Sequence, residues 1–305
     1  MLKTIELETG GVHIAATAAG DPSAPTIVLL HGWPHSRALY DGVIDLLGDD
    51  FFVLAMDLPA IGDSRGAPRS AEKSVLADIV IGAAEAAGAR DIVVAGLDVG
   101  GMTAFAAARD HGSRIRGAIV MNTVIPGLEP WDKILADPRI WHFAFHGIPQ
   151  LPETLVAGHE RVYFDFFHNV LTRQPQRISD SLRTAFARAY ARPEALKAGF
   201  DWYRAMAADA KHNAERARIT TPLLYARGDA DKRAIEPYLE GLRGAGVEAL
   251  ESRVIADCGE LAPIEQPRAF SDIIADFAAR HTAERSSRAH KHTRAPVNAT
   301  AARRG

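Results

Sequence analysis

One short segment combines small residues and an acidic residue at a spacing that could present a nucleophile. The apolar, β-branched run Ile92–Leu97 leads into Gly96-Leu97-Asp98-Val99-Gly100, and Met102–Ala108 follows with helix-forming composition. This order predicts a strand, a sharp turn and a helix. The spacing is that of the Gly-x-Ser-x-Gly turn, where small neighbours let one side chain stand on a strained turn above a sheet. Asp98 takes the place of the serine. The alternative is an ordinary strand–helix turn in which this aspartate has no chemical role.

Three further polar residues directly follow apolar runs that are predicted as strands. They are His31, Asp57 and Asn122, after the runs Thr26–Leu30, Phe51–Met56 and Gly117–Met121. A helix is predicted at Ser70–Ala87, with Ser70 as its N-cap. Strands that alternate with helices predict an α/β fold, with a mostly parallel sheet and helices on both faces. Ligands bind at the carboxyl ends of such strands, so we expect these side chains and Asp98 to share one edge of the sheet.

The chain is predicted to be a sheet domain with an inserted helical cap. Residues 1–125 form the first part of the sheet domain. Residues 126–218 contain helix-like, aromatic-rich segments and no clear strand, so they are expected to cover the strand ends. The sheet resumes over residues 219–281, which close with a helix at Pro267–His281. Residues 282–305 are polar and lack an apolar period, so they are predicted to be a disordered tail.

Composition narrows the function classes. A chain of 305 residues, 47% of them hydrophobic, can bury a large core. A net charge of -3 gives no basis for nucleic-acid binding. The single cysteine, Cys258, fits a reducing compartment, and the first residues lack the apolar region of a signal peptide. No apolar run is long enough to span a membrane. We therefore expect a cytoplasmic protein without membrane or nucleic-acid partners, with monomer and dimer both left open.

Several motifs occur in an order that is typical of one superfamily. The first three are His31-Gly32-Trp33-Pro34, then Asp57-Leu58 with Gly62-Asp63-Ser64, then the Gly-x-Asp-x-Gly turn. The later ones are Trp202-Tyr203-Arg204-Ala205-Met206, Gly228 with Asp231, and Gly259 with Glu265-Gln266-Pro267. Over residues 5–281 the chain thus resembles the α/β-hydrolase superfamily, in particular the branch of epoxide hydrolases and haloalkane or haloacetate dehalogenases. The resemblance implies the α/β-hydrolase fold with an inserted helical cap.

The resemblance also implies a two-step reaction at Asp98. A carboxylate is ionised at neutral pH, so it can attack an epoxide or displace a halide without a base, forming an alkyl ester. A general base then activates water to hydrolyse that ester. The backbone N–H groups of Val99 and Trp33 correspond to the oxyanion donors of the family. The same resemblance implies a cis peptide bond before Pro34. We expect His31 and Pro34 to lie at the substrate or leaving-group pocket, with His31 holding the loop and transferring no proton.

On the cap, Tyr203 matches the second of the two tyrosines that donate hydrogen bonds to the epoxide oxygen in epoxide hydrolases. The first would lie near Trp141–Phe145, which contains His142 and no tyrosine. Trp141 and His142 therefore either bind the leaving group or pack the lid. Tyr163 belongs to an aromatic stripe at helical spacing and is expected to pack.

Two positions depart from the family pattern. Haloacetate dehalogenases carry arginines just after the nucleophile, whereas residues 99–103 contain no cation, which disfavours a small halo-acid substrate. Glu260 stands where the family has its catalytic histidine, and Asp231 matches the acid that orients it. Three clustered carboxyls at Asp98, Glu260 and Asp231 cannot all stay ionised cheaply, so at least one pKa should rise. We expect Glu260 to replace the histidine as an acid or base.

Two function classes follow from these residues. The first is a hydrolase that opens an epoxide through an ester on Asp98, with dehalogenation of an apolar organohalide as the alternative. The second is a lidded binding protein, or an enzyme of non-hydrolytic chemistry, because Glu260 is a weaker base than histidine near pH 7. An aromatic-rich lid favours a small apolar or aromatic ligand; its residues are Trp131, Trp141, Phe143, Phe166, Phe167 and Trp202. No metal-ligand cluster or phosphate-binding loop occurs, so no cofactor or metal is implied.

Overall fold

The computed structural model describes residues 2–292 and contains one eight-stranded sheet in the order β1-β2-β4-β3-β5-β6-β7-β8. The first two strands form a hairpin, and β2 pairs antiparallel with β4. All later neighbours are parallel. The strands are β1 (Lys3–Thr9), β2 (Val12–Ala19), β3 (Thr26–Leu30), β4 (Phe52–Met56), β5 (Val93–Leu97), β6 (Gly117–Met121), β7 (Leu223–Gly228) and β8 (Leu250–Ile255).

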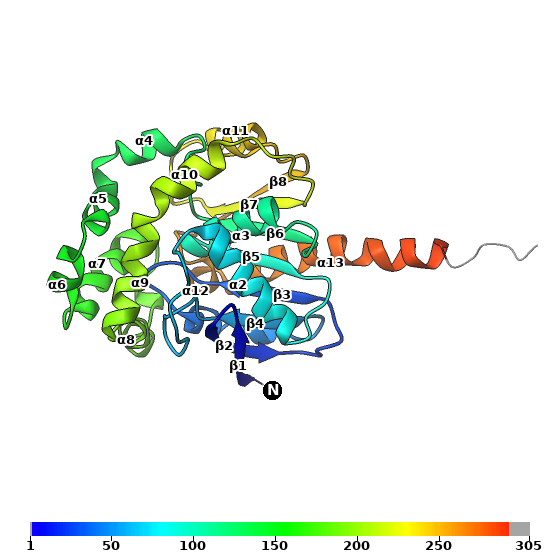
Figure 1. Cartoon of the computed structure of the whole chain (residues 1–305), viewed down its shortest axis with the longest axis horizontal. Coiled ribbons are helices and arrows are strands. Elements are labelled where there is room, and N and C mark those ends of the chain that lie inside the picture. The colour runs from blue at the N-terminus through cyan, green and yellow to red at the C-terminus, as the bar shows by residue number, and fades with distance from the viewer. Residues whose placement is uncertain (1, 293–305) are drawn as a thin grey trace, which may run out of the picture.

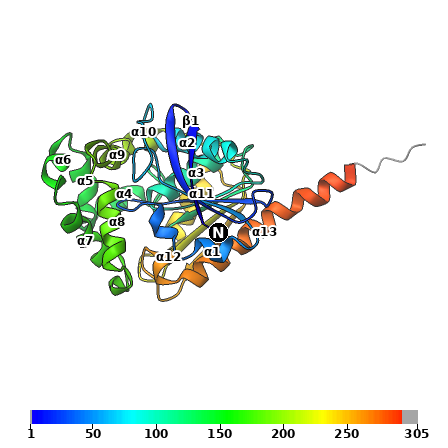
Figure 2. The same cartoon turned by 90° about the horizontal axis from the view of Figure 1, so that it is seen from below.

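Helices cover both faces of this sheet, as Figure 2 shows. One face is covered by α2 (Lys73–Ala86), α3 (Val99–Asp110) and α11 (Glu236–Ala245), and the other by η1 (Arg37–Tyr40), α1 (Ile44–Leu47), α12 (Ala262–Glu265) and α13 (Pro267–His292). Side chains alternate between the faces along each strand. Val28 therefore packs in one hydrophobic core and its neighbour Leu29 in the other. Burial on both faces explains why the strands from β3 to β7 are mostly apolar, although β7 includes the buried Arg227.

A helical insertion separates β6 from β7, and Figure 1 shows it grouped at one side of the sheet. Between those strands the described chain contains only helices and connecting loops. These are α4 (Trp131–Leu135), η2 (Pro138–Ile140), α5 (Trp141–Gly147), α6 (Leu151–Val156), α7 (Glu160–Leu171), η3 (Pro175–Arg177), α8 (Asp180–Ala189), α9 (Pro193–Arg204) and α10 (Met206–Ala214). We call this insertion the cap.

A buried ion pair joins the cap to the sheet domain. The ammonium of Lys73, at the start of α2, donates to a carboxylate oxygen of Asp209 on α10 at 2.7 Å and to the carbonyl of Trp202 at 2.6 Å. The two side chains are only 3% and 5% exposed. Because every charge here has a partner, the pair fixes where α9 and α10 lie against α2.

Two predicted boundaries are wrong. Helix α2 begins at Lys73, and the Ser70 hydroxyl instead accepts a hydrogen bond from the backbone N–H of Glu72 before the helix starts. Helix α13 continues past His281 to His292, because the polar residues that follow contain no helix breaker and include good helix formers. The rest of the predicted disordered tail, 293–305, lies outside the described residues. Within residues 2–292, no helix combines the length and the apolar character needed to cross a membrane.

Candidate active site

Asp98 stands on a strained turn between β5 and α3. Its φ of 52° and ψ of -120° are unusual for a residue with a side chain. The turn is so tight that a Cβ on Gly96 would collide with the carbonyl of Gly100, and a Cβ on Gly100 would collide with the carbonyl of Leu30. The two glycines are therefore required by close backbone approach, which is the physical basis of the motif.

The Asp98 carboxyl faces the loop after β3. The backbone N–H of Trp33 donates to its Oδ2 at 2.8 Å. Burial raises the pKa of Asp98 to about 6, although the N–H groups of Trp33 and Val99 and the charge of Lys73 oppose this rise. At pH 7 the carboxyl is therefore largely ionised. Oδ2 is thus held by the backbone.

A buried histidine holds the loop that carries Trp33. His31 is fully buried, and its Nε2 accepts a hydrogen bond from the backbone N–H of Leu58 at 3.1 Å. Through this contact the imidazole ties the loop after β3 to the segment that follows β4. The peptide bond between Trp33 and Pro34 is cis, as the resemblance implied.

The cap brings Tyr203 and His142 together, and the charge of Asp98 acts on Tyr203. Their ring centroids are 6.1 Å apart, and both side chains are buried. Burial raises the pKa of Tyr203, and the charge of Asp98 adds to this, so the phenol stays protonated. Burial lowers the pKa of His142 to about 4, which keeps its imidazole neutral. Each side chain can therefore act as a neutral hydrogen-bond donor.

Trp141 lies farther out on the cap than His142. It is 44% exposed and packs against Phe166 and Phe167. Its ring centroid is 6.1 Å from that of His142. Trp141 therefore packs the cap, which is one of the two roles expected for it.

Two aromatic contacts were missed by the sequence analysis. The indole of Trp33 lies among the cap rings, 5.8 Å from Tyr203 between centroids, and its Nε1–H has no partner among the described residues. His146 lies 4.4 Å from the ring of Tyr203, and its Nε2 is 2.7 Å from the hydroxyl of Tyr163. Tyr163 therefore both packs, as predicted, and makes a polar contact with the histidine.

Glu260 lies in the loop between β8 and α12, and its backbone is firmly held. Its N–H donates to the carbonyl of Leu171 at 3.0 Å, and its carbonyl accepts from Asn122 Nδ2 at 2.7 Å. Burial and the nearby charge of Asp98 raise the pKa of Glu260 to about 8, while Arg233 opposes the rise. Position 260 therefore carries a carboxyl that is mostly protonated at pH 7.

The neighbouring Glu265 has a structural role in this loop. Its side chain is fully buried, and its carboxylate accepts backbone N–H bonds from Gly259 and Leu261 at 3.1 Å and from Arg173 at 2.8 Å. These bonds connect the cap to the loop that carries Glu260. They explain why an acid stands at this point of the sequence motif.

Asp231 is paired with two arginine side chains. Arg233 donates to it from its backbone N–H at 3.0 Å and from Nε at 2.9 Å, and Nη1 of Arg227 lies 3.6 Å away. Burial favours the neutral form of Asp231, but the hydrogen bonds from Arg233 outweigh this and lower its pKa. Of the three predicted carboxyls, Asp98 and Glu260 thus have raised pKa values, and Asp231 stays ionised. Arg233, which the sequence analysis missed, is the positive charge between Asp231 and Glu260.

In the part of the chain that the structure describes, the His, Cys, Asp and Glu side chains form no group that could hold a metal ion.

Comparison with known proteins gives the same fold and a related activity class. The family model described as the alpha/beta hydrolase fold matches residues 25–267. The soluble epoxide hydrolase of Corynebacterium sp. (strain C12) is 27% identical over 276 residues, covering 88% of this chain and 93% of that protein. Epoxide hydrolase 4 of Mus musculus is 25% identical over 74% of this chain and 65% of its own length.

Solved structures agree with this assignment. Cfl2 of Burkholderia cenocepacia has a TM-score of 0.78 and 29% identity, and the match covers 90% of this chain and 95% of Cfl2. The epoxide hydrolase CorEH superposes with a TM-score of 0.81 at 24% identity, over 93% of this chain and 99% of CorEH, which shows the shared fold. The chain therefore belongs to the α/β-hydrolase fold family and is a hydrolase with epoxide hydrolases among its relatives.

Proposed function

We propose that the protein hydrolyses an epoxide through a covalent ester on Asp98, with Glu260 as the general base. The observation that carries this proposal is the pairing of an ionisable carboxyl on a strained turn with a second carboxyl whose pKa responds to it. Epoxide hydrolases among the relatives support the choice of reaction.

In the first step, Oδ1 of Asp98 attacks an epoxide carbon. A carbon–oxygen bond forms to the carboxylate, and the ring carbon–oxygen bond breaks. Tyr203 and His142 are the candidate neutral donors of hydrogen bonds to the departing oxygen. This oxygen takes its proton from the Tyr203 hydroxyl, which regains a proton from water before the next turnover. The product of this step is a hydroxyalkyl ester of Asp98.

In the second step, water attacks the carbonyl carbon of the ester, and the bond between that carbon and the alkyl oxygen breaks. The departing diol oxygen takes the second proton of the attacking water, which leaves Asp98 as a carboxylate. The negative charge develops on Oδ2, the oxygen that already accepts the N–H of Trp33, and the N–H of Val99 is the second candidate donor. The ionised form of Glu260 removes the proton from the attacking water. With a pKa of about 8, about a tenth of the molecules carry this form at pH 7.

The surroundings favour an apolar or aromatic substrate without charge. Trp33, Tyr203 and Phe143 pack ring against ring at the inner face of the cap. No cation follows Asp98 in residues 99–103, so nothing there would neutralise a substrate carboxylate. An aromatic epoxide such as styrene oxide is therefore a suitable probe.

A second candidate rests on the raised pKa of Glu260. A protonated Glu260 cannot take a proton, so a ligand bound at Asp98 would be rearranged or only bound, and not hydrolysed. An organohalide is the third arm of the test, because displacement of halide needs the same nucleophile.

The experiment is a single turnover with styrene oxide in water labelled with oxygen-18, followed by intact-protein mass spectrometry. In the first turnover we expect label to enter the Asp98 carboxyl and not the diol, which takes its second oxygen from Oδ1. We also expect the ester to accumulate on a Glu260→Gln variant and no ester to form on Asp98→Asn. Failure of styrene oxide to modify Asp98 in any variant, while 1-bromohexane releases bromide, would point to dehalogenation. No label and no halide release would favour the non-hydrolytic function.

A further inference from the structure

Two buried histidines line a small cavity beside Glu260. His35, in the loop after β3, is 3% exposed, and His168, on α7 of the cap, is 2% exposed. Their ring centroids are 5.3 Å apart. Both line the same cavity as Glu260 and Thr172, which has room for about one water molecule. Neither histidine takes part in the two steps proposed above.

The ring nitrogens of these histidines lack protein partners. Neither nitrogen of His35 and not the Nε2 of His168 has a hydrogen-bond partner among the described residues, although all three atoms are buried. Buried polar atoms are nearly always hydrogen-bonded, to protein or to an ordered water. A water in this cavity could donate to one imidazole, accept from the other and contact the Glu260 carboxyl, which satisfies a water's usual number of partners.

Asp165 fixes which nitrogen of His168 carries the proton. Its Oδ1 lies 3.4 Å from Nδ1 of His168. Burial favours the neutral form of Asp165, but hydrogen bonds from Arg183 at 2.8 Å and Arg161 at 2.7 Å outweigh it and lower its pKa. An ionised carboxylate only accepts hydrogen bonds, so Nδ1 must be the N–H, and the Nε2 lone pair points to the cavity.

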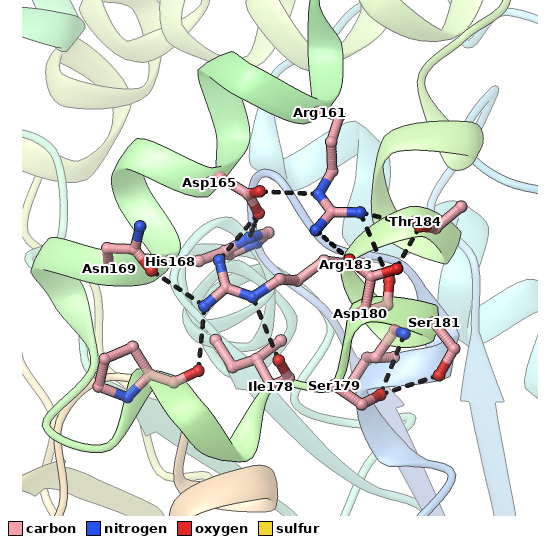
Figure 3. Close-up of polar contacts among 12 residues, drawn as sticks. Arg161, Asp165, His168, Asn169, Ile178, Ser179, Asp180, Ser181, Arg183 and Thr184 are labelled. Carbon is pink, nitrogen blue, oxygen red and sulfur yellow. Dashed lines mark hydrogen bonds and ion pairs between the residues drawn. The ribbon is translucent and has the colours of Figure 1, made fainter.

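Asp165, on the side of His168 away from Glu260, lies next to solvent. Figure 3 shows Asp165 between Arg161, Arg183 and His168, at the join of α7 and α8. Asp165 and the two arginines also line an open groove on the cap surface. The carboxylate and imidazole therefore connect the cavity beside Glu260 to the outside of the cap.

We propose that His35 holds a water against Glu260, and that His168, oriented by Asp165, accepts through this water the proton that Glu260 gains. The inference rests on the proposed function. As the attacking water bonds to the ester carbon, its O–H bond breaks and the proton goes to the Glu260 carboxylate. Glu260 then passes a proton to the cavity water, which gives one of its own protons to Nε2 of His168. The imidazolium is paired with Asp165 and loses its proton to solvent, which leaves Glu260 ionised again.

Burial and the surrounding charges set pKa values at which His168 holds the proton only briefly. Burial lowers the pKa of His168 to about 4, and Arg183 adds to this while Asp165 opposes it. Burial, together with His168 and His31, lowers the pKa of His35. With Glu260 at about 8, the transfer is uphill by about four orders of magnitude. Against a prefactor of about 6 × 10¹² s⁻¹, this still permits transfer far faster than a typical kcat. His168 is thus a positioning and relay residue that never touches the substrate.

The test separates the two half-reactions with styrene oxide. We expect His168→Gln to form the Asp98 ester at a rate within about twofold of the unmodified protein. Its ester hydrolysis should fall by about tenfold to a hundredfold, with a changed pH profile below pH 8. His159→Gln, the same substitution at an exposed cap position, is the matched control and should change neither step. A purely structural role would slow both steps together.

A second measurement needs no substrate. Nitrogen-15 NMR of the His168 ring should report the Nδ1–H form, and Asp165→Asn should change it and slow ester hydrolysis as well. Unchanged hydrolysis in His168→Gln, or an Nε2–H form in the unmodified protein, would overturn the relay and leave the proposed function standing. Absence of any ester on Asp98 in the unmodified protein would instead refute the proposed function, and the relay with it.

Discussion

The raised pKa of Glu260 makes the protein less stable as the pH increases, and Glu260→Gln should remove this effect. Below pH 4.5 the folded and unfolded chains both hold the Glu260 proton. Between 4.5 and about 8 the folded protein keeps it while the unfolded chain releases it, so the free energy of unfolding falls as pH rises. Above about 8 both states have lost the proton and the loss is complete. Glutamine carries no such proton.

The size of the effect follows from the same values. The gap between 4.5 and about 8 corresponds to on the order of 5 kcal/mol, at about 1.36 kcal/mol per pH unit. Glu260 is partly accessible to solvent, which screens its charge, so we expect about 2–4 kcal/mol. Glu260→Gln should therefore gain this much over the unmodified protein at pH 9, and much less at pH 5.

Urea unfolding at pH 5, 7 and 9 measures this difference. The matched control is Glu236→Gln, which makes the same chemical change at a carboxylate that is 65% exposed. It should show no comparable dependence on pH. If the advantage of Glu260→Gln were the same at all three pH values, Glu260 would not be a neutral carboxyl in the folded protein, and the assignment of its role as base would lose its main support.

The remaining predictions concern the pH dependence of the reaction and the stability of the fold around the site. The rate of Asp98 ester hydrolysis in single turnovers should rise about tenfold from pH 6 to pH 7 and level off above about pH 8, because only ionised Glu260 takes a proton; a flat profile would contradict this. Asp209→Asn should cost about 3–5 kcal/mol in urea unfolding because it leaves the Lys73 ammonium buried without its counter-charge. Replacing both members of that pair by apolar residues should recover much of the loss. Gly100→Ala should cost about 3 kcal/mol or more or prevent folding, since its Cβ would meet the carbonyl of Leu30. Gly147→Ala, where an added Cβ meets nothing within 4 Å, should be close to neutral in the same assay.

The sequence predicts features that are written in local spacing. The turn at Asp98 follows from two glycines that allow close backbone approach. The mostly parallel sheet with helices on both faces follows from apolar runs that must be buried on both faces. The position of Glu260 follows from Gly259 and Glu265, whose backbone bonds shape its loop.

Features that depend on side-chain direction or on distant segments could not be predicted in this way. Trp141 and His142 are neighbours in the sequence, yet the histidine is buried and the tryptophan is 44% exposed. The contact of His35 with His168 joins a loop of the sheet domain to a cap helix, and no periodicity connects them. The engagement of Asp231 by Arg233 depends on the conformation of a long side chain. Such conformations are set by tertiary packing and charge, not by the pattern of residue types.

The glutamate at position 260 is therefore part of a rearranged charge network. In the family pattern, the acid at position 231 would accept the N–H of an imidazole. An ionised Glu260 offers no N–H, and next to an unpaired Asp231 it would add only repulsion. Arg233 resolves this conflict, because it donates to Asp231 and its charge also favours the ionised form of Glu260. The arginine thus satisfies the acid that a histidine would have satisfied, and at the same time it keeps the pKa of Glu260 low enough for the carboxylate to act as a base near neutral pH.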